Sequence, residues 1–186
     1  MPKDLTLPEA AALLPQVRRI CVIGTSGGGK STLSAALSAR LDLPHIPMDR
    51  DIRWLPGWQV RPKAEQRTRL SALVATDRWI IDGTSVSSLD LRLPRTDLVI
   101  WMRPTRHTAL WNLVRRVARH HGQTRPDMAE GCAEHLPDRA FLSYIWQFEQ
   151  RESPRITAAL ATHGPTVPLL TLRGHRDTRD LLSRLA

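Results

Sequence analysis

The chain has few cysteines and no long apolar run. Its two cysteines are Cys21, in an apolar strand pattern, and Cys132, in a polar stretch, so no disulfide framework is implied. No apolar run approaches the roughly 18 residues of a transmembrane helix. The N-terminal segment MPKDLTLPEAAALLPQV carries prolines and acidic residues where a signal peptide needs an apolar block. We therefore expect a cytoplasmic protein with no membrane partner.

Lysine is scarce as well, and arginine supplies nearly all of the positive charge. Lysines stand only at positions 3, 30 and 63, yet Lys and Arg together number 27 against 18 Asp and Glu, a net charge of +9. Such a charge suits nucleic acid or another polyanion. A genome-wide preference for arginine, or a phosphate-handling enzyme, explains it equally well. We keep nucleic acid as an alternative partner and do not favour it.

The length and the spacing of the apolar segments predict one α/β domain over residues 1–186. Short apolar strands alternate with helices, which indicates βαβ units and a parallel five-stranded sheet with helices on both faces. Ligands bind at the carboxyl ends of such strands, so Gly24, Asp49 and Asp82 should face one crevice. We predict strands at 19–24, 45–48, 79–82, 97–102 and 166–172, and helices at 31–41, 62–75, 104–119, 138–150, 154–162 and 177–185.

The segment GTSGGGKS lies between the first strand and the first of these helices. Gly24, four residues, Gly29, Lys30 and Ser31 match the Walker A pattern G-x-x-x-x-G-K-[ST] in its required context, which makes a stray glycine turn a poor alternative. Glycines let the backbone wrap an anion, with the helix N-terminus behind it. Lys30 should reach the β- and γ-phosphates, and Ser31 should offer its hydroxyl to Mg²⁺. A three-layer P-loop NTPase fold follows, with ATP and Mg²⁺ bound at Gly24, Thr25, Ser26, Gly27, Gly28, Gly29, Lys30, Ser31 and Thr32.

Three acidic residues follow predicted strands. Asp82 ends the strand WIID, where a carboxylate can hold the water shell of Mg²⁺; the alternative is a turn before Gly83. Asp49 and Asp51 follow the second strand. Either can face an acceptor, and Asp49, nearer the strand end, is our candidate for taking the proton of an attacking hydroxyl. The alternative for this pair is a solvated loop.

Arginines dominate the segment between Asp97 and Asp127, which has no acidic residue. We predict a lid over about 115–137, in which Arg116 and Arg119 neutralise charge in the transition state. A basic helix end that complements the helix dipole is the alternative. Arg92 follows the third strand and can hold an acceptor anion, or else form a surface ion pair. The six arginines of the segment are 103, 106, 115, 116, 119 and 125.

These motifs together resemble the adenylate-kinase-related P-loop proteins often labelled "DNA topology modulation proteins". The likeness covers roughly residues 19–174 and rests on the glycine loop and on DRDIRWLPGW, RWIIDGTSVSSLDLRLPRTDLVIW, TRPDMAEGC and FLSYIWQFEQRESPRI. It implies a nucleoside-monophosphate-kinase-like fold with an acceptor-binding insert at about 49–77 and a short lid. By this likeness Asp49 and Arg92 fall on the acceptor side, and Arg115, Arg116 and Arg119 on the lid side.

The chain departs from adenylate kinases at two points. TSVSS follows Gly83 in place of the Phe-Pro-Arg that grips AMP, and Cys132 stands alone where a zinc lid needs several cysteines. The DRD at 49–51 instead resembles acidic pairs of shikimate kinase, which phosphorylates a hydroxyl. We predict an ATP-dependent phosphotransferase acting on a small acceptor, either a nucleoside monophosphate or another hydroxyl or phosphate compound. A nucleotide-switched DNA-associated regulator and an ATPase without acceptor are the alternatives.

Overall fold

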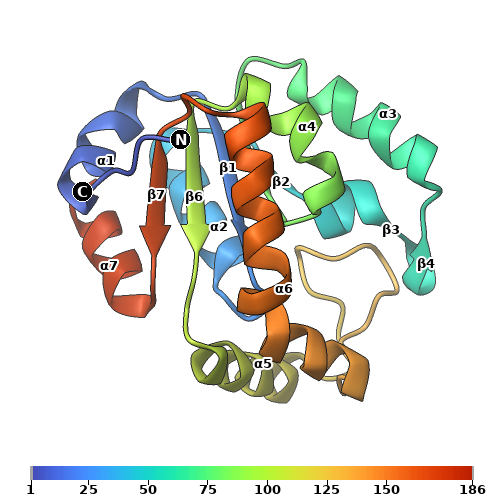
Figure 1. Cartoon of the computed structure of the whole chain (residues 1–186). Coiled ribbons are helices and arrows are strands. Elements are labelled where there is room, and N and C mark those ends of the chain that lie inside the picture. Colours follow the sequence, from blue (N-terminus) through green and yellow to red (C-terminus); the bar gives the residue numbers. More distant parts are fainter. Residues whose placement is uncertain (1, 186) are drawn as a thin grey trace.

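A parallel five-stranded sheet forms the centre of the computed structural model, which describes residues 2–185 (Figure 1). The strand order is β2-β5-β1-β6-β7, and all four pairings are parallel. The predicted sheet is confirmed. The short β2 lies at the edge, where its Pro47 can be accommodated. The strands are β1 (Arg19–Gly24), β2 (His45–Pro47), β5 (Trp79–Asp82), β6 (Leu98–Met102) and β7 (Leu169–Leu172).

Helices cover both faces of this sheet because its strands are apolar on both sides. Cys21 and Ile23 of β1 join a core with helices α3, α4 and α6, whereas Ile20 and Val22 join a core with α1, α2 and α7. Figure 1 shows α6 crossing one face of the sheet. The helices are α1 (Leu7–Leu13), α2 (Lys30–Leu41), α3 (Lys63–Val74), α4 (Leu89–Arg92), α5 (Arg106–His120), α6 (Arg139–His163) and α7 (His175–Ser183).

Helix α6 corrects one expectation from the sequence. We predicted two helices separated before Pro154, but one helix runs from Arg139 to His163 with the proline inside it. Proline removes one backbone hydrogen bond from a helix interior. Phe148 on one side of it and Ile156 and Leu160 on the other are buried in the same core. Packing of this shared face against the sheet therefore keeps the two halves in one helix.

The predicted insert and lid region are bonded to each other. The insert contains a small hairpin of β3 (Trp54–Leu55) and β4 (Gln59–Val60). The Gly57 amide donates to the Glu130 carbonyl at 3.2 Å, and the Trp58 indole donates to the Ala133 carbonyl at 3.1 Å. The segment after α5 thus lies against the hairpin. No helix within residues 2–185 has the length and apolar character needed to span a membrane.

Candidate functional site

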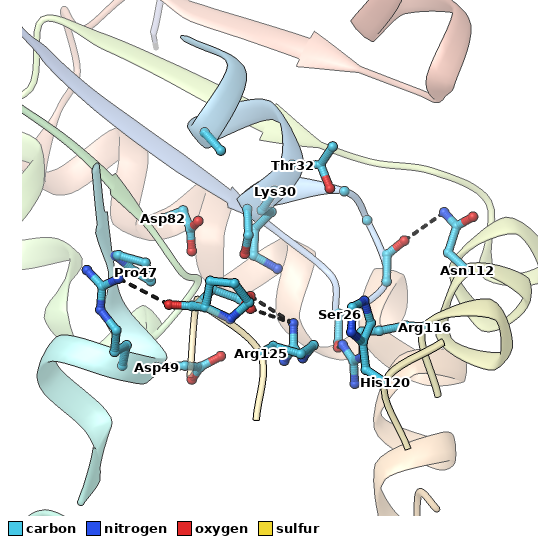
Figure 2. Close-up of a pocket in the computed structure, with 18 of the residues that line it drawn as sticks. Ser26, Lys30, Thr32, Pro47, Asp49, Asp82, Asn112, Arg116, His120 and Arg125 are labelled. Carbon is cyan, nitrogen blue, oxygen red and sulfur yellow. Dashed lines mark hydrogen bonds and ion pairs between the residues drawn. The ribbon is translucent and has the colours of Figure 1, made fainter. Parts of the chain in front are cut away.

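A cavity of about 560 Å³ lies at the carboxyl ends of the strands (Figure 2). The loop after β1 forms its centre, Pro47 of β2 and Asp82 of β5 contribute one wall, and α5 contributes another. Of the three strand-end residues expected to face one crevice, Asp49 and Asp82 line this cavity and Gly24 does not; Thr25, also expected at the site, does not line it either. The expected site residues that line it are Ser26, Gly27, Gly28, Gly29, Lys30, Ser31, Thr32, Asp49, Asp82, Arg116 and Arg119.

The phosphate loop (residues 24–32) takes a backbone course that requires glycine. Gly27 and Gly29 have φ angles of 72° and 87°, in the left-handed region. A Cβ on Gly24 would lie 2.1 Å from the Met102 carbonyl oxygen, and one on Gly27 would lie 2.2 Å from that of Ala109. Helix α2 begins at Lys30, so its N-terminal turn opens on the cavity. A bare backbone cradle at a helix N-terminus fits a phosphate chain.

Lys30 extends along this loop. Its ammonium donates to the Thr25 carbonyl at 2.9 Å. Burial lowers the pKa of Lys30, and the attraction of Asp82 and Asp49 opposes that effect only in part. A desolvated ammonium beside a cradle of backbone amides is suited to an anion.

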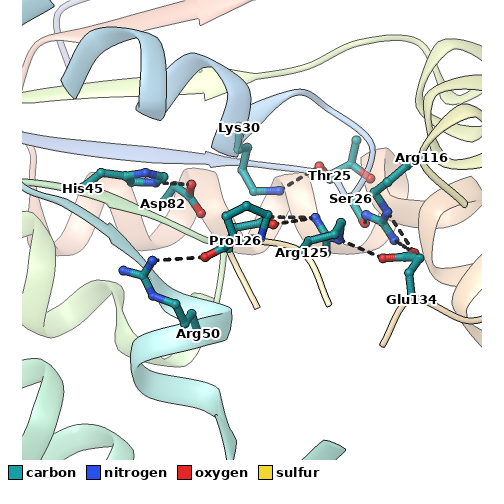
Figure 3. A network of polar contacts seen from close by, with 11 residues as sticks. Thr25, Ser26, Lys30, His45, Arg50, Asp82, Arg116, Arg125, Pro126 and Glu134 are labelled. Carbon is teal, nitrogen blue, oxygen red and sulfur yellow. Dashed lines mark hydrogen bonds and ion pairs between the residues drawn. The ribbon is translucent and has the colours of Figure 1, made fainter. Parts of the chain in front are cut away.

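Asp82 is almost fully buried, with 4% of its surface exposed. Its carboxylate lies 2.7 Å from the His45 ring nitrogen Nε2 (Figure 3). Ser31 and Asp82 line the same cavity. Residues 2–185 hold no group of three or more metal-ligating His, Cys, Asp or Glu side chains. Mg²⁺ at nucleotide sites keeps waters and phosphate oxygens and takes only one or two protein ligands, so Ser31 and Asp82 fit it.

Asp49 and Asp51 lie in a short helical turn (Asp49–Arg53) and have different surroundings. Asp49 is exposed to the cavity, yet the surrounding walls desolvate its carboxylate and raise its pKa, against the attraction of Arg53 and Lys30. Asp51 does not line the cavity, contrary to our expectation for an acceptor ligand. It accepts two hydrogen bonds from the Arg50 guanidinium, at 2.7 and 2.9 Å. Asp51 therefore orients Arg50, which does line the cavity.

Two arginines of the predicted lid, Arg116 and Arg125, are held by a buried carboxylate that we did not anticipate. Glu134, 5% exposed, accepts from Arg116 at 2.8 and 3.0 Å and from Arg125 at 2.8 Å (Figure 3). Arg116 also approaches the Ser26 hydroxyl at 3.4 Å, and Arg125 pairs with Asp127. Burial, then the neighbouring Arg125, lowers the pKa of Arg116. Through this network, Arg116 brings a positive charge of the lid region to the phosphate loop.

Arg92 lies away from the cavity, which corrects its expected role at the acceptor. The residue is fully buried, at 0% exposure. Its guanidinium donates to the carbonyls of Gly83, Thr84 and Ser85 at 2.7, 3.0 and 3.2 Å. The Thr84 hydroxyl in turn accepts from the Gly24 amide at 2.9 Å. Arg92 therefore braces the segment that supports the phosphate loop.

Several cavity residues had no prediction from the sequence. Asn112 donates to the Gly27 carbonyl at 2.9 Å and lies 3.2 Å from the His175 ring nitrogen. Its spacing to Arg116 and Arg119 on α5 places them on one helix face, a periodicity that would have revealed it. No such signal marks His45, a cavity residue on the strand paired with that of Asp82, or Glu134, which holds cavity arginines but does not line the cavity. The tryptophans at 54, 58 and 111 do not line the cavity.

The fold that carries this site is also found in known proteins. No family model matches the chain. The uncharacterized protein YqaC of Bacillus subtilis (strain 168) is 27% identical over 149 residues, 78% of this chain and 81% of YqaC. Shikimate kinase from Acinetobacter baumannii, in complex with shikimate, has a TM-score of 0.57 at 14% identity, with 94% of each chain covered. Deoxyadenosine kinase from M. mycoides with bound dATP has a TM-score of 0.51 at 15% identity, covering 89% of this chain and 95% of the kinase.

These likenesses establish the fold. The chain has the architecture of small-molecule P-loop kinases, as its α/β fold class predicted. None of these three proteins carries the label "DNA topology modulation protein". The resemblance noted in the sequence is therefore supported as far as the kinase fold.

Proposed function

We propose that the protein is an ATP-dependent phosphotransferase that moves the γ-phosphoryl group of ATP·Mg²⁺ to a small acceptor. The observation that carries this proposal is the order of groups along one cavity. Asp49 and Asp82 lie on one side of Lys30, and Ser26 and Asn112 lie on the other (Figure 2). A phosphate cradle flanked by two separate regions suits a donor and an acceptor, whereas an ATPase needs only the donor region.

The phosphate loop would hold the donor. Its backbone amides and Lys30 bind the phosphate chain, and Ser31 and Asp82 hold Mg²⁺ directly or through its waters. The metal supplies charge neutralisation on the phosphate oxygens. His45 fixes the orientation of the Asp82 carboxylate through their 2.7 Å contact.

Asp49 would serve the acceptor. Its carboxylate opens into the cavity, and its raised pKa makes it a better proton acceptor than an ordinary aspartate. Arg116 and Arg119 would stabilise the charge that develops on the transferred group. Arg116 is already directed at Ser26 of the phosphate loop, which supports its place in this pair.

The test is ADP release from ATP·Mg²⁺ with and without a panel of acceptors, with Lys30→Ala as the blank. We expect one acceptor to raise the rate of the native chain sharply. Lys30→Ala should fold normally, because the core does not use Lys30, and should lose turnover on the order of 100-fold or more. Native turnover that no acceptor changes would contradict the proposal and favour an ATPase or a nucleotide switch. DNA binding measured against salt concentration would then be the next assay.

A further inference from the structure

We infer that the acceptor is a small non-aromatic compound that carries hydroxyl groups and no phosphate, such as a polyol or a hydroxy acid. This inference rests on the proposed phosphotransferase function. It selects between the two acceptor classes that the sequence left open, because a nucleoside monophosphate is both aromatic and dianionic. Two observations carry it: the side chains that line the acceptor side of the cavity, and the partners of its arginines.

In the described part of the chain, the acceptor side of the cavity carries no Phe, Trp or Tyr ring on which a base could stack. Among residues 2–185, those that line it include no Phe, Trp or Tyr and no large aliphatic side chain. Proteins usually recognise an unpaired base by stacking it on an aromatic ring as well as by hydrogen bonds. The acceptor side, on the Asp49 side of Lys30, is polar apart from Pro47, labelled in Figure 2, and Pro126, labelled in Figure 3. Its residues are His45, Pro47, Asp49, Arg50, Pro126 and Asp127, together with Arg125, which pairs with Asp127, and Asp82, which we assign to Mg²⁺. The ring of His45 is bonded to Asp82 at 2.7 Å.

The nearby tryptophans are used elsewhere. Trp54 and Trp58 pack edge to face with ring centroids 5.1 Å apart, and both pack against a buried cluster that includes Met128 and Cys132. The Trp58 indole donates to the Ala133 carbonyl at 3.1 Å. These rings fasten the hairpin of the insert to the lid region. They are therefore not available as a platform for a base.

The arginines of the acceptor side are already paired with carboxylates. Arg50 makes two hydrogen bonds with Asp51 and donates to the Pro126 carbonyl at 3.1 Å. Arg125 pairs with Asp127 at 2.8 Å and with Glu134. A dianionic acceptor phosphate would thus meet the Asp49 and Asp127 carboxylates while Arg50 and Arg125 are already paired, a larger electrostatic cost than for a neutral polyol or a singly charged hydroxy acid.

The same groups suit hydroxyls. The carboxylate oxygens of Asp49 and Asp127 can accept the hydrogen bonds that hydroxyl groups donate. In the transfer, the oxygen of one acceptor hydroxyl forms a bond to the γ-phosphorus. The bond from that phosphorus to the β,γ-bridging oxygen breaks, so ADP leaves, and the hydroxyl proton passes to the Asp49 carboxylate.

The first experiment compares acceptor classes with γ-labelled ATP·Mg²⁺. The probes are glycerol, myo-inositol, gluconate and shikimate; adenosine and deoxyadenosine; and AMP, CMP and dTMP. We expect kcat/KM for at least one polyol or hydroxy acid to exceed that of every nucleoside and nucleotide by tenfold or more. A nucleoside or nucleotide as best acceptor would overturn this inference and leave the phosphotransferase intact. Label released to water at a rate that no probe changes would overturn both.

A variant tests the charge argument directly. Asp127→Asn removes one carboxylate and frees Arg125 from one of its partners. We expect it to lower kcat/KM for the preferred hydroxyl acceptor about tenfold and to tighten AMP binding severalfold, without a change in the KM for ATP. Asp77→Asn, at an exposed position away from the cavity, is the matched control. Weaker or unchanged AMP binding in Asp127→Asn would contradict the argument. Tighter AMP binding would support it, because a loss of structure does not improve the affinity for a ligand.

Discussion

The Glu134 carboxylate holds the Arg116 guanidinium at 2.8 Å, and its second oxygen holds Arg125 at the same distance. Arg116 comes from α5 and Arg125 from the segment that follows it. One buried acidic side chain therefore aligns two arginines along the wall of the phosphate cavity. Both arginines line that cavity and Glu134 does not, so any effect of Glu134 on the proposed transfer would pass through them.

Glu134→Gln should lower kcat about tenfold and leave the KM for the acceptor nearly unchanged. The amide keeps the shape of the side chain but has only one accepting oxygen, so one arginine loses its partner. Steady-state kinetics with both substrates varied would measure this. Glu130→Gln, in an exposed position of the same segment, is the control. An equal loss of kcat in both variants would mean that the segment, and not the arginine pairing, sets the rate.

Local patterns account for what the sequence predicted correctly. The apolar run WIID predicted β5 with both of its bounds, and spacing alone predicted the glycine loop between β1 and α2, whose Lys30 and Ser31 line the cavity. Two other features depend on residues that only the fold brings together. One is the pairing of Glu134 with Arg116. The other is the burial of Arg92, whose guanidinium lies 3.4 Å from the Cys21 sulfur. Arginine is mostly an exposed residue, so nothing in the neighbouring residues predicted that position 92 lies in the core.

Asp49→Asn should abolish the acidic limb of the pH–rate profile. Burial raises the pKa of Asp49, so in the native chain kcat/KM for the acceptor should fall as pH decreases through a value above the ordinary 3.8. General-base removal lowers rates about 100- to 10,000-fold. The profiles of both proteins, measured at saturating ATP·Mg²⁺, give the comparison. An acidic limb that persists in Asp49→Asn would assign the proton acceptor to another group.

The same substitution should stabilise the fold at neutral pH. A carboxylate whose folded pKa is raised lowers stability above that pKa, and the penalty vanishes as pH falls below the unfolded value. Thermal unfolding without nucleotide should therefore show a higher Tm for Asp49→Asn at pH 7, with a gain that shrinks in acid. A lower Tm at pH 7 would show that the ionised carboxylate supports the structure.

His45→Ala should raise the Mg²⁺ concentration needed for half-maximal turnover about 10- to 100-fold, the usual effect of losing a residue that orients a metal ligand. His45 is the side chain that contacts the Asp82 carboxylate, at 2.7 Å. His45→Gln retains a hydrogen-bond donor and should have a smaller effect. Turnover measured against free Mg²⁺ at saturating ATP tests the pair. Curves that superpose on the native one would remove Asp82 from the metal site.

Arg92→Lys should destabilise the protein by roughly 3 kcal/mol, because a buried lysine cannot reproduce the planar set of donors. Three carbonyls, of Gly83, Thr84 and Ser85, depend on that guanidinium. Urea unfolding should show a lower midpoint, whereas the exposed Arg95→Lys should behave as the native protein. Because the Thr84 hydroxyl bonds to the Gly24 amide, kcat should fall as well, and the KM values for ATP and for the acceptor should change to a similar extent. A native unfolding midpoint combined with a raised KM for the acceptor alone would return Arg92 to the acceptor site.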